Sequence, residues 1–309
     1  MSNLVIKFEE IKPNDILLVG GKGLALGELA NAGFPVPEGF VICSETFEKF
    51  LNDNNISGKI NEILNKLEEG NIANSAKEIQ QLIANCEINM ETEEAIYRLF
   101  DEEKLLYVAV RSSATAEDNP KMSWAGELET FLYVNKNDLL QRIKDCWSSL
   151  YSPRALTYRL EKMVEGDIKV AVVIQKMVPS EIAGIAFTVH PVTKNKNEIF
   201  IEAGFGLGEY VVGGDITPDK YVIDKNDFAF LSAEINQQEK MLIFDGAIVS
   251  SKDVPRAQKK TQKIEGKKII ELAKMTKDIE DHYKFPCDIE WALEKGKIYI
   301  LQSRPITTL

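Results

Sequence analysis

The sequence predicts a protein with both helices and strands, and segments of the two periodicities are gathered into separate runs. Apolar residues recur at helical spacing over 44–103, whereas strand candidates follow one another over 184–249. A last pair of strands is predicted at the end of the chain, around residues 288–304. At 309 residues, the chain is long enough for one large two-lobed domain or for two domains.

The composition is that of an ordinary globular protein, with 44% hydrophobic and 28% charged residues. The formal net charge of −11 argues against broad binding to nucleic acid or to anionic membranes, which would need a basic surface. The N-terminal residues lack the apolar core of a signal peptide, and no apolar run approaches the ~20 residues of a membrane span. The four cysteines show no metal-type spacing, so we expect reduced thiols in a cytoplasmic protein: Cys43, Cys86, Cys146 and Cys287.

A glycine-rich segment follows the first strand candidate. Residues 16–19 are predicted as a short strand that enters Gly20-Gly21-Lys22-Gly23, and residues 24–30 as a helix. The spacing does not fit the P-loop motif. Glycines before a helix still let backbone N–H groups approach an anion, and Lys22 adds a positive charge. The alternative is a plain turn between a strand and a helix.

A second polar segment begins where the strand predicted over 105–110 ends, at Arg111-Ser112-Ser113. Residues 111–126 are rich in Ser and are predicted to form a loop that is mobile without a ligand. Hydroxyl groups and an Arg at a strand end could clamp phosphate, and a solvated loop is the alternative. Further on, Gln175 ends an apolar strand over 169–178, where it could read a base edge or could simply be an edge residue.

Two other patterns carry no function. Residues 204–208 resemble a dinucleotide fingerprint, but the third glycine falls one position early and no strand–helix–strand crossover surrounds it. The two histidines, His190 and His282, form no metal or relay cluster, so both are interpreted as structural. A helix is predicted over 266–283, and it leads into the final strand pair.

The final strand pair carries four polar side chains. Asp288 and Glu290 share one face of the first strand, and Gln302 and Arg304 share one face of the second. The four meet if Glu290 lies opposite Gln302, which requires an odd-numbered loop, and residues 295–297 supply three residues. Tyr299 and Leu301 would then point the other way. Oxygen ligands of this kind suit Mg²⁺, and a guanidinium beside them could grip phosphate. A surface hairpin with an ordinary salt bridge is the alternative.

Taken in order along the chain, these segments resemble a known family. The shared stretches are 19–23, 110–118, 125–126, 187–188, 206–209, 288–291 and 301–305. They are similar to the N-terminal nucleotide-binding domain of the phosphoenolpyruvate synthase and pyruvate, phosphate dikinase family. That family includes the rifamycin phosphotransferases, and the Gly-Gly-Lys-Gly variant favours this branch. The resemblance implies an ATP-grasp fold, in which two α+β lobes with mixed or antiparallel sheets clamp ATP. We expect these lobes over residues 1–178 and 179–309.

The resemblance also implies roles for individual residues toward ATP and Mg²⁺. Lys22, Arg111 and Arg304 would hold the triphosphate and act in catalysis. Glu290 and Gln302 would bind Mg²⁺, with Asp288 in support. The remaining expected contacts are Gln175 at the adenine, and Gly126 and Thr130 near the phosphates.

The function implied is the Mg-ATP-binding part of a dikinase-type phosphotransferase that phosphorylates a histidine elsewhere and yields AMP. Relatives continue into domains that carry this histidine and the final acceptor site. We therefore expect an enzyme that is incomplete as an isolated chain, and a histidine domain in trans or in a longer native chain. The final acceptor could be pyruvate, water, phosphate or a rifamycin-type antibiotic. The alternatives are a non-catalytic nucleotide-sensing or docking module, and a ligase that yields ADP. No nucleic-acid or membrane partner is expected.

Overall fold

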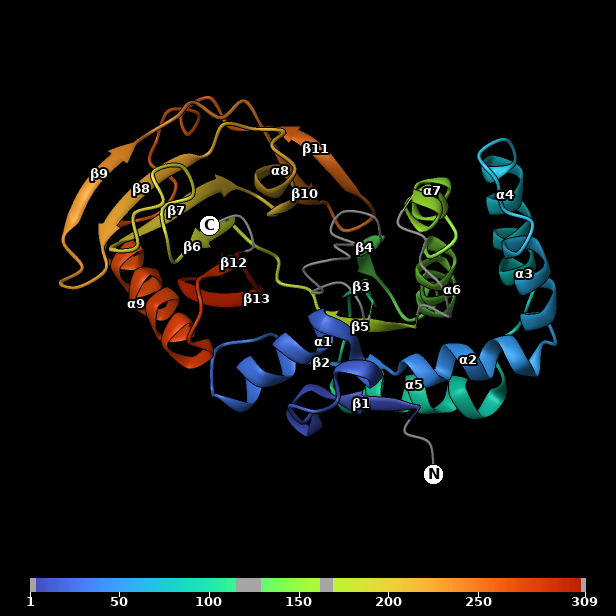
Figure 1. The fold of residues 1–309 in the computed structure, drawn as a ribbon. Helices are drawn as coiled ribbons and strands as arrows, with labels where there is room; N and C mark the ends of the chain where they lie inside the picture. The colour runs from blue at the N-terminus through green and yellow to red at the C-terminus, as the bar shows by residue number, and fades with distance from the viewer. Residues whose placement is uncertain (1–3, 115–128, 162–168, 307–309) are drawn as a thin grey trace. The chain divides into compact units, whose positions relative to one another are not determined.

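The structure is a computed structural model, and it describes residues 4–114, 129–161 and 169–306. The chain divides into two compact units (Figure 1). Unit 1 comprises Met1–Asn31 and Glu38–Met177, and unit 2 comprises Ala32–Pro37 and Val178–Leu309. The short piece before Glu38 belongs to unit 2 because it contacts the last strand, where Ile300 N donates to Pro35 O at 3.0 Å. Among the described residues, no helix is long and apolar enough to cross a membrane.

Unit 1 is built on a five-stranded antiparallel sheet in the order β1-β2-β5-β3-β4, with helices on both faces (Figure 1). Its helix α1 contacts β3 and β5, and the larger helical layer includes α2 and α6, which also contact these strands. The elements in chain order are β1 (Val5–Lys7), η1 (Phe8–Glu10), α1 (Ile16–Asn31), β2 (Gly39–Ile42), α2 (Ser44–Asp53), α3 (Ser57–Leu64), α4 (Ile72–Ala84), α5 (Met90–Glu102), β3 (Val108–Ala114), β4 (Thr130–Val134), α6 (Leu139–Ser149), α7 (Pro153–Glu161) and β5 (Val170–Lys176).

The core of unit 1 lies between the sheet and the larger helical layer. Alternate residues of β3 and β5 point into it, which is the pattern expected of strands with one buried face. Phe47 and Phe50 of α2 pack against Trp147 of α6, with ring centroids 5.4 and 4.9 Å apart. The amphipathic helices predicted over 44–103 are confirmed, because their apolar stripes form this core.

Two element predictions in unit 1 are wrong. Residues 16–19 are the first turn of α1 and not a strand, so the glycine-rich segment interrupts a helix instead of preceding one. Residues 111–114 continue strand β3 and are not part of a loop. They pair with residues 170–173 of β5, and this pairing keeps a serine-containing segment extended. Residues 115–128 of the predicted loop lie outside the described part of the chain.

Unit 2 contains a six-stranded antiparallel sheet in the order β13-β12-β6-β7-β8-β9 and a separate two-stranded sheet of β10 and β11. The α+β class predicted from the sequence is confirmed. The elements are β6 (Ile182–Phe187), β7 (Glu198–Phe205), α8 (Glu209–Val212), β8 (Asp219–Asp224), β9 (Phe230–Glu234), β10 (Lys240–Phe244), β11 (Val249–Asp253), α9 (Gly266–Tyr283), β12 (Cys287–Glu294) and β13 (Lys297–Pro305).

Helix α9 covers one face of the large sheet, where it contacts β6, β7, β8 and β12. Its bounds agree with the helix predicted from the sequence, and its apolar residues Ile269, Leu272 and Ile279 are fully buried. The matching side chains of the sheet, such as Trp291, are also fully buried. The other face of the sheet carries the polar side chains of the predicted site.

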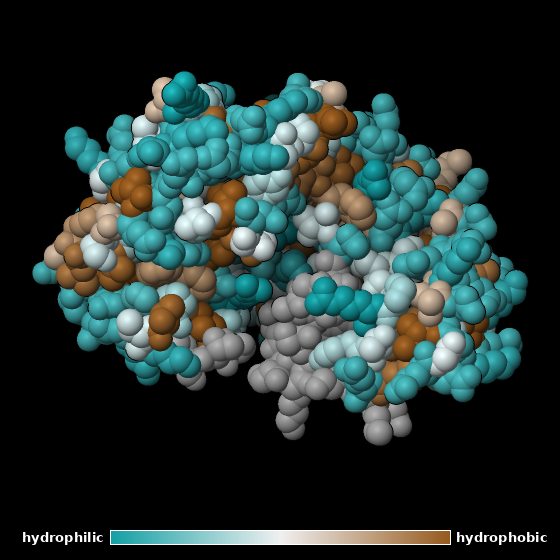
Figure 2. All heavy atoms as spheres, turned by 90° about the horizontal axis from the view of Figure 1, so that it is seen from above, coloured by the Kyte–Doolittle hydropathy of each residue, from teal (hydrophilic) through white to brown (hydrophobic). Residues whose placement is uncertain are grey.

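In the face shown in Figure 2, hydrophilic residues predominate and hydrophobic residues form only small separate patches. A net charge of −11 and a surface of this kind favour solubility over broad association.

Candidate functional site

The predicted site residues fall into two groups, one in each unit. In unit 1, the glycine-rich segment lies against strand β3. Gly20 breaks helix α1 with φ 68° and ψ 175°, so that a new helical segment begins just before Lys22. Ser113 Oγ donates to Val19 O at 2.9 Å and accepts from Gly23 N at 3.3 Å, which bridges the break on both sides. The chain therefore places half-buried Lys22 in the first turn of a helical segment held onto the sheet.

Glycine is required at position 20 for two reasons. Its positive φ is disfavoured for residues with a side chain. A Cβ atom there would also lie 2.3 Å from Ser113 Oγ and 2.4 Å from Ser113 O. The close approach of this backbone to β3 thus depends on the absence of a side chain.

Three further predicted residues lie on neighbouring strands of unit 1. Arg111 of β3 is only 8% exposed, and its Nη1 donates to Gln175 Oε1 of β5 at 3.3 Å. Thr130 of β4 is the direct strand partner of Arg111. The structure thus brings Arg111, Gln175 and Thr130 together across three adjacent strands. The remaining predicted contact, Gly126, lies outside the described residues.

In unit 2, the final hairpin has the predicted register. Glu290 lies opposite Gln302 and Asp288 lies opposite Arg304, which places all four side chains on one face. The predicted three-residue loop is wrong, because only Lys295 and Gly296 separate the strands and both have positive φ. A β-bulge restores the register: Trp291 pairs with Ile300 and Glu290 with Gln302, so one extra residue of β13 lies between.

Packing explains why the hairpin takes a tight turn and a bulge. With this turn, Ile298 and Ile300 lie opposite Leu293 and Trp291 on the apolar face, and they are 2% and 0% exposed. A three-residue loop would have put Tyr299 there instead. Tyr299 and Leu301 instead pack against a small cluster of Val178, Ala183 and Ala292, so the prediction that they point toward the apolar face is wrong. Burying two isoleucines beside Trp291 removes apolar area from water, and this favours the tight turn with the bulge.

The Asp288 carboxylate holds the Arg304 guanidinium. Arg304 Nε donates to Asp288 Oδ2 at 2.8 Å, and Nη2 lies 2.7 Å from the same oxygen. Burial raises the pKa of Asp288, Arg304 acts in the opposite direction, and the Glu290 charge adds to the rise. Asp288 is 9% exposed as a residue, whereas the side chain of Arg304 is 45% exposed. Asp288 therefore holds one edge of the Arg304 guanidinium, while the Arg304 side chain stays about half exposed to solvent.

The donor set fits a hard divalent cation only in part. Within the described residues, no group of three or more His, Cys, Asp or Glu side chains could hold a metal. Glu290 and Gln302 supply one carboxylate and one amide oxygen on the same face, and Asp288 is engaged by Arg304. Mg²⁺ is commonly held by one or two carboxylates together with phosphate oxygens of the substrate. This set therefore fits Mg²⁺ that arrives with a nucleotide.

One residue of this face was missed by sequence reasoning. Strand pairing runs from Glu290 to Ile185 of β6 and on to Glu202 of β7, so Glu202 shares the polar face. Burial raises the pKa of Glu202, Lys220 lowers it, and Asp288 raises it further. The sequence indicates a strand here, but only the strand order shows that it lies beside the hairpin.

Comparison with known proteins shows to which family the chain belongs. Residues 16–309 match the family described as pyruvate phosphate dikinase, AMP/ATP-binding domain. A probable phosphoenolpyruvate synthase from Archaeoglobus fulgidus is 43% identical over 99% of this chain and 42% of its own length. The phosphoenolpyruvate synthase from Pyrococcus furiosus is 38% identical over 98% of this chain and 43% of its own length.

A third relative is the rifampicin phosphotransferase from Bacillus cereus, 39% identical over 100% of this chain and 36% of its own length. The chain thus spans less than half the length of each of these relatives. Because the family match covers nearly all of the sequence and the predicted motifs fall within it, this chain belongs to the family of pyruvate phosphate dikinase AMP/ATP-binding domains.

Proposed function

We propose that this chain binds Mg-ATP and serves as the nucleotide-binding part of a dikinase-type phosphotransferase. The observation that carries the proposal is the polar face of the final hairpin, where Glu290 faces Gln302 and Asp288 holds Arg304. A docking module has no need of such a set, whereas phosphoryl transfer relies mainly on positioning and on neutralisation of charge. The family membership and the buried Arg111 of unit 1 support the same function.

Each of these residues would have a separate role toward the phosphates or Mg²⁺. Arg304 would grip phosphate oxygens with its planar guanidinium, and Asp288 would keep that guanidinium in position. Lys22 and Arg111 would contribute positive charge from unit 1. Glu290 and Gln302 would hold Mg²⁺, which when bound neutralises phosphate charge.

The acceptor of the phosphoryl group would be a histidine on another domain, present in trans or in a longer native chain. AMP as product requires cleavage of the bond between the α- and β-phosphates: the histidine nitrogen would bond to the β-phosphorus as AMP leaves. The group transferred first would then be the β,γ-pyrophosphoryl group, and loss of its terminal phosphate to water or to phosphate would leave the phosphohistidine. The lengths of the relatives support the presence of further domains. Either phosphoenolpyruvate synthesis or antibiotic phosphorylation, the activities named for the relatives, would fit this first step.

Calorimetric titration with ATP, with and without Mg²⁺, tests the binding step. We expect Glu290→Ala to weaken binding at least tenfold in the presence of Mg²⁺ and much less in its absence. Glu294→Ala is the matched control, because Glu294 lies on the same face of β12 but pairs with Lys297 at the hairpin end. Equal losses in the two variants would contradict the metal role of Glu290.

Product analysis tests the chemistry. The chain should be mixed with ATP and with the histidine-bearing remainder of a relative, and nucleotides should be separated by chromatography. AMP that appears only in the mixture supports the dikinase reaction. ADP would instead indicate ligase-type chemistry, and tight ATP binding without any turnover would favour a sensing module.

A further inference from the structure

A pocket of about 600 Å³ lies within unit 2, and its lining includes none of the residues assigned above to ATP or Mg²⁺. Its floor is a row of strand partners that crosses four strands: Phe187 of β6, Phe200 of β7, Val222 of β8 and Ser232 of β9. Small-molecule sites commonly have volumes of about 300–1,000 Å³. The pocket therefore has room for a ligand other than the nucleotide.

Aromatic rings form much of the pocket surface. The Phe200 ring centroid lies 6.2 Å from that of Phe187 and 4.8 Å from that of His190. The His190 ring is held in place because its Nδ1 accepts the backbone N–H groups of Val192 and Thr193 at 3.2 and 3.3 Å. A ring nitrogen that accepts hydrogen bonds carries no proton, so this ring is neutral. The aromatic surface is thus fixed and uncharged.

The central acidic group of the pocket is the half-buried Glu202 of β7. Its carboxylate makes no hydrogen bond or ion pair with the residues that the structure describes. Burial raises the pKa of Glu202, and its strand neighbour Lys220 lowers that pKa by less. The Lys220 ammonium itself lies 3.5 Å from the Glu234 carboxylate. A charge that is partly removed from water needs compensation, and Glu202 receives too little of it.

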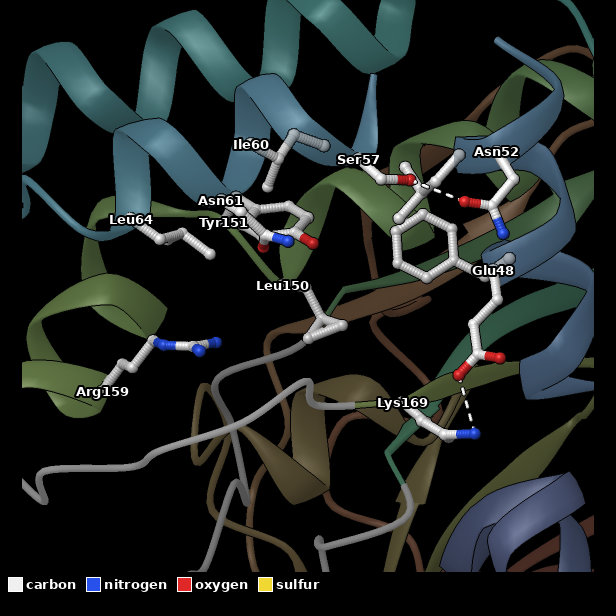
Figure 3. A pocket seen from close by; sticks show the side chains of 12 residues that line it. Glu48, Asn52, Ser57, Ile60, Asn61, Leu64, Leu150, Tyr151, Arg159 and Lys169 are labelled. Atoms are coloured by element: carbon white, nitrogen blue, oxygen red, sulfur yellow. Dashed lines mark hydrogen bonds and ion pairs between the residues drawn. The ribbon is translucent and has the colours of Figure 1, made fainter. Parts of the chain in front are cut away.

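The pocket in the helical layer of unit 1 differs in this respect (Figure 3). There the Glu48 carboxylate pairs with the Lys169 ammonium at 2.7 Å, and Ser57 Oγ donates to Asn52 Oδ1 at 3.0 Å. The acidic side chain of that lining is therefore already compensated. The lining of the unit 2 pocket combines two carboxylates with one ammonium, so it has a net negative charge.

We propose that the unit 2 pocket binds a small organic amine in its protonated form, with an apolar body. The ammonium group pairs with Glu202, which supplies the missing compensation. The apolar body lies against Phe187 and Val222. The faces of aromatic rings also attract cations, because their π systems are negative there. An organic anion would instead be repelled by the net charge of the lining.

The pocket adjoins the final hairpin without sharing its polar residues. Strand β6 lies between them, and its Ile185 pairs with Glu290 on one side and with Glu202 on the other. Adjacent strands are about 4.8 Å apart, so the backbones of Glu290 and Glu202 are about 10 Å apart. A positive charge beside Glu202 attracts phosphates held at the hairpin, so amine and ATP strengthen each other's binding. This coupling rests on the proposed function, whereas the site itself does not.

The first experiment titrates the intact chain with benzylamine and, separately, with benzyl alcohol and with methylamine. Benzyl alcohol has nearly the same shape without the charge, and methylamine has the charge without the ring. Heteronuclear NMR shifts give the affinities. We expect saturable benzylamine binding with shifts at residues of β7, β8 and β9, and at least tenfold weaker binding of the other two compounds. No saturable binding of benzylamine, or an affinity equal to that of either comparison compound, overturns the proposal.

Two variants and one control locate the site. Glu202→Gln should weaken benzylamine at least tenfold, and Ser232→Trp, which fills the pocket from the exposed strand β9, should abolish binding. Glu198→Gln is the matched control, because Glu198 lies on the same face of β7 but outside the lining, where it accepts from Asn195 Nδ2. It should change the affinity less than twofold.

Glu202→Gln has no partner to lose, so we expect it to fold and to melt no lower than the wild type. The Ser232→Trp variant provides a second test if the first fails to fold. Benzylamine that binds both pocket variants as tightly as the wild type overturns the assignment. An equal loss of affinity in Glu198→Gln and Glu202→Gln overturns it as well, because a general charge effect would then replace a site.

The last arm measures ATP affinity by calorimetry at saturating benzylamine. We expect at least a twofold increase in the wild type and none in Ser232→Trp, and ATP must raise benzylamine affinity by the same factor. An unchanged ATP affinity in the wild type overturns the coupling alone. If ATP does not bind at all while benzylamine does, the proposed function fails and the amine site stands.

Discussion

Two glycines at similar backbone angles show how differently the two halves of the predicted site are held. Gly20 in unit 1 has φ +68°, and Gly296 at the tip of the unit 2 hairpin has φ +76°. A Cβ at Gly20 would lie 2.3 Å from Ser113 Oγ, whereas a Cβ at Gly296 would meet nothing within 4 Å. The unit 1 half depends on backbone in close contact with a strand. The unit 2 half depends on side chains paired across a hairpin.

The two arginines differ in the same way. Arg111 is 8% exposed and donates to the neutral amide of Gln175, so its position is set by burial within the sheet. Arg304 has a side chain 45% exposed and is held by the Asp288 carboxylate. We infer that changes in the first half affect folding together with binding, whereas changes in the second half affect binding with less effect on folding.

The largest expected effect is that of Gly20→Ala. The added methyl group would overlap Ser113 O and Oγ, and the positive φ would be strained as well. We expect a loss of about 3 kcal/mol or more in the free energy of unfolding, if the variant folds at all. Chemical denaturation measures it. A loss below about 1 kcal/mol would show that α1 moves away from β3 without cost, and the comparison would fail.

The next effect is a difference in stability between variants of the two arginines. Arg111→Ala should cost about 2 kcal/mol of stability, because it removes a buried side chain and leaves the buried Gln175 Oε1 without this donor. Arg304→Ala should cost less, since its side chain is 45% exposed, yet it should weaken ATP binding at least as strongly. Thermal unfolding and calorimetric titration of both variants give the two quantities. Equal stability losses would contradict the distinction.

A smaller effect is expected for Gly296→Ala. The turn keeps its shape because nothing opposes the methyl group, and only the positive φ is strained. We expect a loss of about 1 kcal/mol in stability and unchanged ATP affinity. The same denaturation and binding measurements apply. Reduced ATP affinity in this variant would show that the turn, and not the bulge, fixes the position of Gln302.

The smallest effect concerns pH. Burial raises the pKa of Asp288, so the folded protein binds this proton more tightly than the unfolded chain does. The free energy of unfolding therefore falls as pH rises through the raised pKa, and Asp288→Asn should remove that part of the slope. The melting temperature of the variant relative to the wild type should rise from about pH 4 to about pH 7. A parallel pair of curves would contradict a raised pKa at Asp288.

The sequence predicted the elements that have regular periodicity. Helix α9, the helical run over 44–103 and the pairing of Glu290 with Gln302 follow from alternation and helical spacing. It failed where tertiary contacts override local pattern. Residues 16–19 are apolar and include the β-branched Ile16 and Val19, as a strand would, yet they form the first turn of α1, which packs on the sheet. Glu202 could not be found without the strand order.

The bulge in β13 is one extra residue, and it can shift along the strand without changing the pairing of the residues beyond it. With the present sequence, the extra residue could lie at position 301 or be absorbed as a third residue of the turn. Both arrangements leave Glu290 opposite Gln302, and only residues 297–301 change faces. The burial of Ile298 and Ile300 keeps the bulge at position 301, next to Gln302. Polar substitutions of Ile298 and Ile300 should therefore move the bulge toward the turn while the polar face stays in register.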